Sequence, residues 1–452
     1  MKPAIPKGTR DFTSSIMMKR NYIFNTIKEV FNLYGYKPIE TPAIENLSTL
    51  MGKYGEEGDK LIFKIVNSGD FKNTISNFEQ STSVELTNQI CEKALRYDLT
   101  VPFARFVVLN RNELNFPFKR YQIQPVWRAD KPQKGRYREF YQCDVDVVGS
   151  KSLLFEYEFI RMIDDVFTKL NLNDITIKLN NRKILYGLVE TIGKLEIFTE
   201  IVTTLDKIEK IGEENLIKEL NILGLDENAI NIVLSFVKLS GTNNEKLDKL
   251  TNILEKSEVG IVGVNELKEV LLLVNNINLK VAQLQIDISL ARGLNYYTGA
   301  IFEVKANNVS IGSICGGGRY DNLTEVFGMP DMSGVGISFG ADRIFDVMTE
   351  LNVFPKTIDI STKVLFINFG DESQKLSLKL IDTLRENGIS CEVYPENSKI
   401  KKQMNYANNN NIPYVIFIGE EEILSAKYKI KDMLSGNENL LKIEEVISFL
   451  KQ

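Results

Sequence analysis

Residues 138–147 alternate polar and apolar side chains in a way that could build a binding surface. Residues two apart in a strand share a face, so polar members fall on one side and apolar members on the other. The polar face offers a cation, an aromatic ring, an amide and two carboxylates, which could grip a charged ligand that carries an aromatic base. Its members are Arg138, Phe140, Gln142, Asp144 and Asp146, opposite Cys143, Val145 and Val147. A solvated sheet face is the alternative interpretation of this strand alone.

Arginines flank the same strand. We expect Arg128 on the preceding strand, and Arg136 and Arg138 across the turn, to converge at one end of a hairpin. Guanidinium groups bind phosphates through paired hydrogen bonds. Exposure on a loop would account for Lys131 and Lys134 in the turn. It would not account for Arg138, which is expected in a strand on the same side as Phe140.

Two glycine-rich stretches carry adjacent tyrosines. Residues 291–299 contain Tyr296 and Tyr297 among small residues, and residues 316–321 place three glycines before Tyr320. Glycine permits close approach of a ligand to the backbone. Taken alone, however, each stretch is more typical of a loop or turn than of a site.

A third glycine-rich stretch, from Gly334 to Arg343, is expected to run as a strand into a helix. It lacks the G-x-G-x-x-G spacing and the βαβ context of dinucleotide-binding proteins, which disfavours a Rossmann site. Arg343 falls in the first turn of the helix, where the helix dipole does not favour a cation. A nearby anion would make that placement intelligible.

Absent residue types narrow the chemistry further. The chain has no histidine, which excludes His-based triads, general bases and metal ligands. Its cysteines, Cys91, Cys143, Cys315 and Cys391, are scattered without a C-x-x-C pair, so we expect buried thiols and no zinc. Chemistry must therefore use arginine, carboxylates, amides and bound ions.

The elements that would position these residues follow from periodicity and turn signals. We expect a helix over 14–34, an antiparallel hairpin of strands 119–128 and 137–148, helices within 184–280, and strands again from 284 to 306. After residue 355, strands and helices alternate, which predicts a small α/β domain with a largely parallel sheet.

Composition sets the class of protein. A chain of 452 residues, 43% apolar and 25% charged, is expected to fold into two or three globular domains. Its net charge of −5 means that a nucleic-acid partner would be met by local basic patches. Residues 1–11 lack an apolar h-region and no later stretch has the length to cross a bilayer, so a cytoplasmic location without a membrane is expected.

Together these segments resemble histidyl-tRNA synthetases over nearly the whole chain. Pro42 is similar to the proline of class II motif 1, the hairpin over 128–146 to motif 2, and Gly340-Ala341-Asp342-Arg343 to motif 3. Residues 95–100 (LRYDLT) and 292–297 (RGLNYY) are similar to the segments that distinguish the histidine enzyme from other class II synthetases. The order of these motifs makes the resemblance specific.

The resemblance implies an α+β fold: a six-stranded antiparallel class II catalytic sheet with a helical insertion, then an α/β anticodon-binding domain. The catalytic core would comprise 1–183 and 281–355, the insertion 184–280 and the anticodon-binding domain 360–452. Such an enzyme activates L-histidine with ATP and Mg²⁺, releases pyrophosphate, and transfers histidine to the 3′ end of tRNA(His). The family works as a homodimer, and Pro42 would belong to its dimer motif.

The resemblance also assigns residues to the nucleotide. Arg128 and Arg343 would hold the ATP phosphates, Phe140 would stack on adenine, and Asp130 and Arg136 would lie beside the nucleotide. Arg292 would contact both the histidine carboxylate and the α-phosphate, which makes Arg128, Arg292 and Arg343 the catalytic set.

The resemblance further assigns residues to the amino acid and to the tRNA. Asp98, Thr100 and Gln142 would bind the α-amino group, Asp146, Tyr297 and Tyr320 would surround the imidazole, and Tyr296 would belong to the same histidine site. The hairpin tip, with Lys131, Gln133 and Lys134, would contact the acceptor stem. Lys399, Lys401 and Lys402 could face the anticodon stem, although a solvated helix end is equally consistent with them.

The sequence disfavours two rival interpretations. A catalytically inactive paralogue, such as the regulatory subunit that partners a short ATP phosphoribosyltransferase, tends to lack the anticodon domain and the motif residues, and both are present here. A class IIa synthetase for threonine, proline or glycine is opposed by residues 292–299 and by the absence of the Cys/His zinc set used for threonine. Asn295 departs from the aspartate of many relatives.

Overall fold

A computed structural model describes residues 2–291 and 296–451 of the chain. Contacts divide it into two compact units, Met1–Phe12 with Arg20–Val353 and Thr13–Lys19 with Phe354–Gln452. Within the described residues, no helix combines the length and the apolar character needed to cross a membrane.

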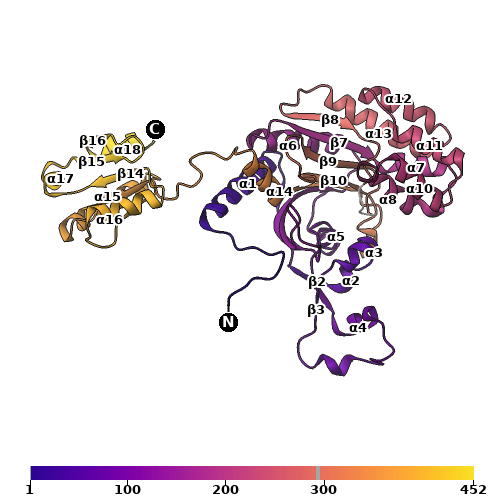
Figure 1. Cartoon of the computed structure of the whole chain (residues 1–452), viewed down its shortest axis with the longest axis horizontal. Coiled ribbons are helices and arrows are strands. Elements are labelled where there is room, and N and C mark those ends of the chain that lie inside the picture. The colour runs from indigo at the N-terminus through magenta and orange to yellow at the C-terminus, as the bar shows by residue number, and fades with distance from the viewer. Residues whose placement is uncertain (1, 292–295, 452) are drawn as a thin grey trace. The chain divides into compact units, whose positions relative to one another are not determined.

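The first unit is built on an eight-stranded sheet (Figure 1). Its order is β1 (Lys37–Pro38), β5 (Phe118–Trp127), β6 (Glu139–Val148), β11 (Gly334–Gly340), β10 (Cys315–Tyr320), β9 (Ala300–Ala306), β7 (Ile175–Asn181) and β8 (Ala282–Ile286). The six strands from β5 to β7 pair antiparallel, whereas β1 and β8 pair parallel with their neighbours. The structure therefore confirms the expected hairpin and the six-stranded antiparallel core.

Helices cover the apolar face of this sheet. Helix α1 (Ser14–Leu33) ends before Gly35, as expected, and α6 (Leu154–Lys169) runs beside it. Phe339 of β11 lies 5.9 Å from Phe31 of α1 and 5.7 Å from Phe167 of α6, measured between ring centroids. Burial of such rings drives the sheet and helices together and leaves the opposite, polar face free to line a pocket.

The three glycines at 316–318 form a central strand, so the expectation of a turn was wrong. A side chain on Gly317 would place its Cβ 2.0 Å from the carbonyl oxygen of Gly336, and one on Gly318 would lie 2.7 Å from the Tyr297 ring. Glycine is needed here because neighbouring strands and rings approach the backbone closely, and not because the chain turns.

Seven α-helices lie between β7 and β8, which confirms the helical character of this stretch (Figure 1). They are α7 (Arg182–Thr191), α8 (Phe198–Asp206), α9 (Ile208–Ile211), α10 (Glu213–Ile222), α11 (Glu227–Val237), α12 (Asn243–Ile253) and α13 (Glu258–Val274). The periodic run from 208 to 223 is two helices, because Gly212 at φ +74° breaks it.

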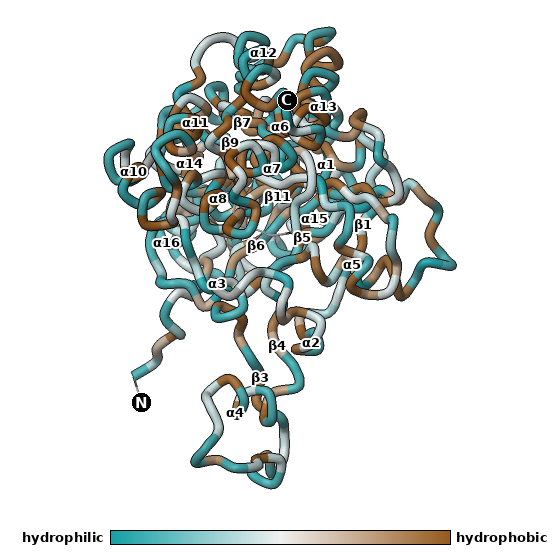
Figure 2. The backbone as a smooth tube through the Cα atoms, turned by 90° about the vertical axis from the view of Figure 1, so that its right-hand side faces the viewer, coloured by the Kyte–Doolittle hydropathy of each residue, from teal (hydrophilic) through white to brown (hydrophobic). Residues whose placement is uncertain are grey.

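A smaller sheet stands beside the main one. It consists of β2 (Ile44–Asn46), β4 (Lys93–Leu95) and β3 (Lys64–Ile65), and is followed by α5 (Thr100–Leu109). Helices α2 (Leu47–Leu50) and α3 (Gly55–Lys60) precede β3. The segment from β3 through α4 (Ser83–Ile90) projects away from the main sheet in both views (Figures 1 and 2).

The second unit contains a five-stranded sheet ordered β13 (Cys391–Val393), β12 (Val364–Phe366), β14 (Tyr414–Phe417), β15 (Tyr428–Asp432) and β16 (Glu438–Leu441). Its helices are α15 (Asp371–Glu386), α16 (Ile400–Asn409), α17 (Glu420–Ser425) and α18 (Ile443–Lys451). The α/β character is confirmed, but the sheet is mixed: β13, β12 and β14 are parallel, and β14, β15 and β16 are antiparallel.

Candidate active site

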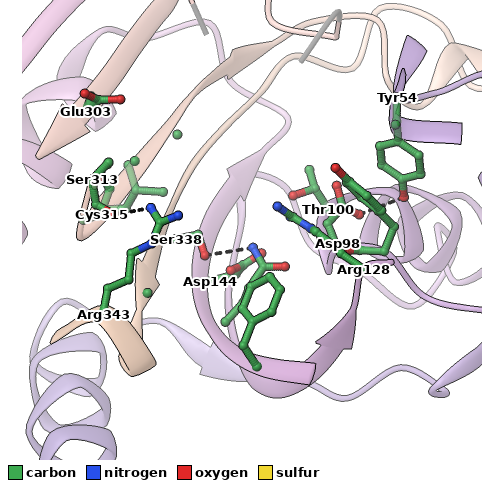
Figure 3. Close-up of a pocket in the computed structure, with 18 of the residues that line it drawn as sticks. Tyr54, Asp98, Thr100, Arg128, Asp144, Glu303, Ser313, Cys315, Ser338 and Arg343 are labelled. Atoms are coloured by element: carbon green, nitrogen blue, oxygen red, sulfur yellow. Dashed lines mark hydrogen bonds between the residues drawn. The ribbon is translucent and has the colours of Figure 1, made fainter. Parts of the chain in front are cut away.

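The polar face of the main sheet lines a pocket of about 690 Å³ (Figure 3). Side chains reach it from strands β6, β9, β10 and β11, from the segment before α5, and from the hairpin tip between β5 and β6. Of the predicted site residues that the structure describes, it brings these together: Asp98, Thr100, Arg128, Asp130, Arg136, Phe140, Gln142, Asp146, Tyr296, Tyr297, Tyr320 and Arg343. Arg292 lies outside the described residues.

Arg343 and Arg128 extend into the pocket from opposite sides, with Asp144 and Ser338 between them (Figure 3). Arg343, in the first turn of α14 (Ala341–Glu350), donates from Nε to the carbonyl of Gly135 at 2.8 Å and from Nη1 to that of Ser313 at 2.7 Å. Two carbonyl acceptors therefore fix the orientation of its guanidinium group.

Arg128 is also held in place. Its Nε donates to the carbonyl of Tyr97 at 3.1 Å, and its guanidinium carbon lies 4.2 Å from the Tyr97 ring centroid and 5.2 Å from that of Phe140. Stacking of a guanidinium group on aromatic faces leaves its edge free for an anion. The two arginines thus form a preorganised cationic pair suited to phosphate.

Asp98 anchors one wall of the pocket. Its carboxylate accepts hydrogen bonds from the Tyr54 hydroxyl at 3.0 Å and from the backbone N–H of Val101 at 3.1 Å, and lies 3.5 Å from the Tyr296 hydroxyl. Burial raises the pKa of Asp98, although these hydrogen bonds and the charge of Arg128 oppose that rise. Tyr54 was missed from the sequence because it stands in the turn before α3, with no motif around it.

Asp146 lies in a fully buried ion pair. Its Oδ2 is 2.8 Å from Nη2 of Arg120, which is 0% exposed, and its Oδ1 accepts from the Tyr320 hydroxyl at 2.7 Å. Burial raises the pKa of Asp146, and the charge of Arg120 opposes the rise. Arg120 was missed, although it faces Asp146 directly in the β5–β6 register.

Tyr320 owes its position to the residue before it. On the opposite side of β10, Arg319 makes a two-pronged pair with the buried Glu156 of α6, at 2.6 and 2.7 Å. Its Nη1 also donates to the Ser333 hydroxyl at 2.7 Å. This network fixes the strand and aims the Tyr320 hydroxyl at Asp146.

Asp144, between Gln142 and Asp146 on β6, is 2% exposed and lines the pocket. Its Oδ1 has no hydrogen-bond partner, and neither has the buried Oε1 of Gln142. Ser338 joins the two residues, since its hydroxyl accepts from Gln142 Nε2 at 3.0 Å and bonds Asp144. Burial raises the pKa of Asp144 to about 7; Arg120 opposes this rise and Asp146 adds to it.

The hairpin tip, at the pocket rim, is exposed. Lys131, Gln133, Lys134 and Arg136 are exposed, and Lys134 pairs with Glu350 at 2.8 Å. Arg138 does not line the pocket with Arg128 as expected. Its side chain instead donates to the carbonyls of Asp130 at 3.1 Å and Lys7 at 3.4 Å, because β6 begins only at Glu139 and Arg138 therefore lies outside the strand.

The other sequence expectations concern cysteine and metal. All four cysteines are buried free thiols, as predicted. No group of three or more Cys, Asp or Glu side chains that could hold a metal ion occurs within residues 2–291 and 296–451. Pro42 is exposed on the first unit.

Asp144→Asn is expected to stabilise the empty protein increasingly as pH rises. The native state keeps a proton on Asp144 up to about pH 7, whereas an unfolded aspartate loses it near pH 4. The native state therefore binds more protons between these values, and the stability due to this group falls as pH rises. Urea unfolding should show the variant gaining about 2–3 kcal/mol over wild type between pH 5 and pH 8.

Asp287→Asn is the matched control. Burial alone would raise the pKa of Asp287, but the 2.6 Å pair with Lys178 and hydrogen bonds from Ser289 lower it overall. That carboxyl is ionised in both states from pH 5 to pH 8, so its variant should differ from wild type by a constant amount. A pH-independent difference for Asp144→Asn as well would contradict the prediction.

Comparisons with known proteins agree with this geometry. The histidyl-tRNA synthetase family matches residues 8–344, and an anticodon binding domain matches residues 363–452. The histidine–tRNA ligase of Phocaeicola vulgatus is 56% identical over 452 residues, covering 100% of this chain and 99% of the relative. That of Bacteroides fragilis is 56% identical over 451 residues, covering 99% of each.

The fold of the chain is also similar to those of solved structures. The crystal structure of histidyl-tRNA synthetase from Nostoc sp. PCC 7120 has a TM-score of 0.84 and 31% identity, covering 100% of this chain and 99% of that chain. An ATP phosphoribosyltransferase regulatory subunit/histidyl-tRNA synthetase from Bacillus halodurans C shares the fold, with a TM-score of 0.72, 19% identity, and coverage of 92% and 98%. The family model matches most of the chain, and the two relatives align with it over nearly their full lengths. This chain therefore belongs to the histidyl-tRNA synthetase family, with a class II catalytic domain followed by an anticodon-binding domain.

Proposed function

We infer that the chain is a histidine–tRNA ligase, which joins L-histidine to ATP as histidyl-adenylate, releases pyrophosphate, and passes histidine to the 3′ end of tRNA(His). The observation that carries this inference is that Arg128 and Arg343 line one pocket together with Asp98, Asp146 and the tyrosines at 296, 297 and 320. Cations suited to phosphate and polar side chains suited to an amino acid thus line the same pocket of about 690 Å³.

In the first step, the histidine carboxylate attacks the α-phosphorus, and negative charge builds on the phosphoryl oxygens. The guanidinium groups of Arg128 and Arg343 would stabilise that charge without reorganising, because each is already held by protein groups. Phe140 would stack on adenine, with Asp130 and Arg136 beside the nucleotide. Arg292 would contact the carboxylate and the α-phosphate.

Magnesium would arrive with ATP. Mg²⁺ in such sites is bound by one or two carboxylates and by substrate phosphates, and Glu303 of β9 lines the pocket on the same side as Arg343 (Figure 3). Glu303 would supply one protein oxygen, and the ion would neutralise phosphate charge.

Selectivity for histidine would come from hydrogen bonding. Asp98, Thr100 and Gln142 would bind the α-amino group, while Asp146, Tyr297 and Tyr320 would surround the imidazole and Tyr296 would complete the wall. A ligand without ring nitrogens would leave buried polar groups unpaired, which is costly.

Two exposed regions would bind the macromolecular partners, which are the tRNA and a second copy of the chain. Lys131, Gln133 and Lys134 at the hairpin tip would meet the acceptor stem of the tRNA in a salt-dependent way. The motif 1 segment around the exposed Pro42 would contribute to a homodimer. We assign residues 1–183 and 281–355 to the catalytic core, 184–280 to the insertion and 360–452 to the anticodon-binding domain.

ATP–pyrophosphate exchange across the twenty amino acids tests the function. Histidine is expected to support exchange at least about 10³-fold faster than any other amino acid, because a site built around ring nitrogens strongly rejects ligands that lack them. Exchange with threonine, proline or glycine, or no exchange at all with a folded protein, would contradict the proposal.

A further inference from the structure

The acceptor atoms on β6 form an incomplete hydrogen-bonding set. Asp144 Oδ1 and Gln142 Oε1 are both buried, both on the pocket side of β6, and both without a donor. A buried acceptor left without a donor is costly. Two such atoms on the same face of one strand that lines the pocket indicate a ligand that brings several donors.

Asp144 differs in this respect from its neighbour Asp146. Both oxygens of Asp146 already have protein partners, Arg120 at 2.8 Å and the Tyr320 hydroxyl at 2.7 Å. Asp144 has a bond from Ser338 but keeps Oδ1 free. Of the two adjacent carboxylates, Asp144 is therefore the one with an oxygen that lacks a donor.

Charge indicates what kind of donor would fit. Arg120 is a buried cation that acts on both Asp144 and Asp146, so once both carboxyls are ionised, as a cationic ligand favours, these two carboxylates and one guanidinium group carry a net charge of −1. Asp98 is close enough to act on both carboxyls as a further negative charge. A monovalent cation with several N–H donors would balance the charge and satisfy the free oxygens.

We propose that Asp144 binds the α-ammonium group of the amino-acid substrate, so that this cation is held by Asp98, Gln142 and Asp144 together. An ammonium group has three donors, and these three side chains supply one acceptor for each. Ser338 positions Asp144 and Gln142 relative to one another through its hydroxyl. The inference rests on the proposed function and adds a residue to its substrate site.

The test compares two ligands that differ only in the amine. Histidinol keeps the ammonium and the imidazole, whereas 3-(imidazol-4-yl)propan-1-ol lacks the amine, and neither has a carboxylate that would sense the charge of residue 144. Calorimetric titration of the full chain at pH 8 should show Asp144→Asn weakening histidinol binding by about 10- to 100-fold. Binding of the amine-free alcohol should stay within about 2-fold of wild type.

Asp164→Asn provides the matched control, since Asp164 is a fully buried carboxylate on α6 that bonds backbone N–H groups outside the pocket. It should leave the affinities for both ligands unchanged. Equal weakening of both ligands by Asp144→Asn would assign the residue to the imidazole or to the pocket wall, and unchanged binding of both would remove it from the site. Either result overturns the inference, whereas failure of wild type to bind histidine and histidinol would instead reject the proposed function.

Discussion

Replacing Arg343 by alanine is expected to slow histidine-dependent ATP–pyrophosphate exchange by about 10²- to 10³-fold. Its guanidinium group is fixed by the carbonyls of Gly135 and Ser313, so it meets developing phosphate charge without rearrangement. Arg343→Lys should be intermediate, because an ammonium keeps the charge but not the planar fork that reaches both carbonyls.

The matched control is Arg111→Ala, which removes an exposed arginine from the loop after α5. Its exchange rate should equal that of wild type. Melting temperatures of all three variants are measured alongside, so that a loss of activity is assigned to chemistry only in a folded protein. An exchange rate for Arg343→Ala close to that of Arg111→Ala would show that phosphate is not held there.

Gly317→Ala is expected to lower the free energy of unfolding by more than about 3 kcal/mol. The added Cβ would lie 2.0 Å from the carbonyl oxygen of Gly336 and 2.6 Å from Cα of Ile337. Both are backbone atoms of the paired strand β11, so relief requires that β10 and β11 separate at the centre of the sheet.

Gly340→Ala is the control, which tests whether a methyl group added elsewhere in this sheet also lowers the free energy of unfolding. Gly340 has φ −82°, and the nearest atom to an added Cβ is the Ile314 carbonyl oxygen at 3.5 Å, which is ordinary contact. Urea unfolding should give a midpoint near wild type for Gly340→Ala and a much lower one for Gly317→Ala. Similar midpoints for the two variants would refute the close approach of β10 and β11.

Much of the catalytic sheet was predictable because its strands have one apolar and one polar face. Period two correctly placed Phe140, Gln142, Asp144 and Asp146 on the pocket side of β6. Arg120 was not found, since its place opposite Asp146 depends on the register set by an irregular turn.

Other features depend on contacts between distant segments. The glycines at 316–318 resemble a turn until β11 and Tyr297 are placed against them. In the second unit, β16 was missed because Glu438–Leu441 is a mostly exposed edge strand without alternation, and the antiparallel half of that sheet was missed with it. The roles of individual site residues remain predictions.

The place of β11 in the sheet has a consequence for biosynthesis. This strand joins β6 to β10, yet it is the last of the eight to be translated. At about 5–20 residues per second, the ribosome needs roughly 10–40 s to proceed from Val148 to Gly334. During that interval the nascent chain carries a finished hairpin with an open edge that attracts other strands, and no ligand can protect it because the pocket does not yet exist.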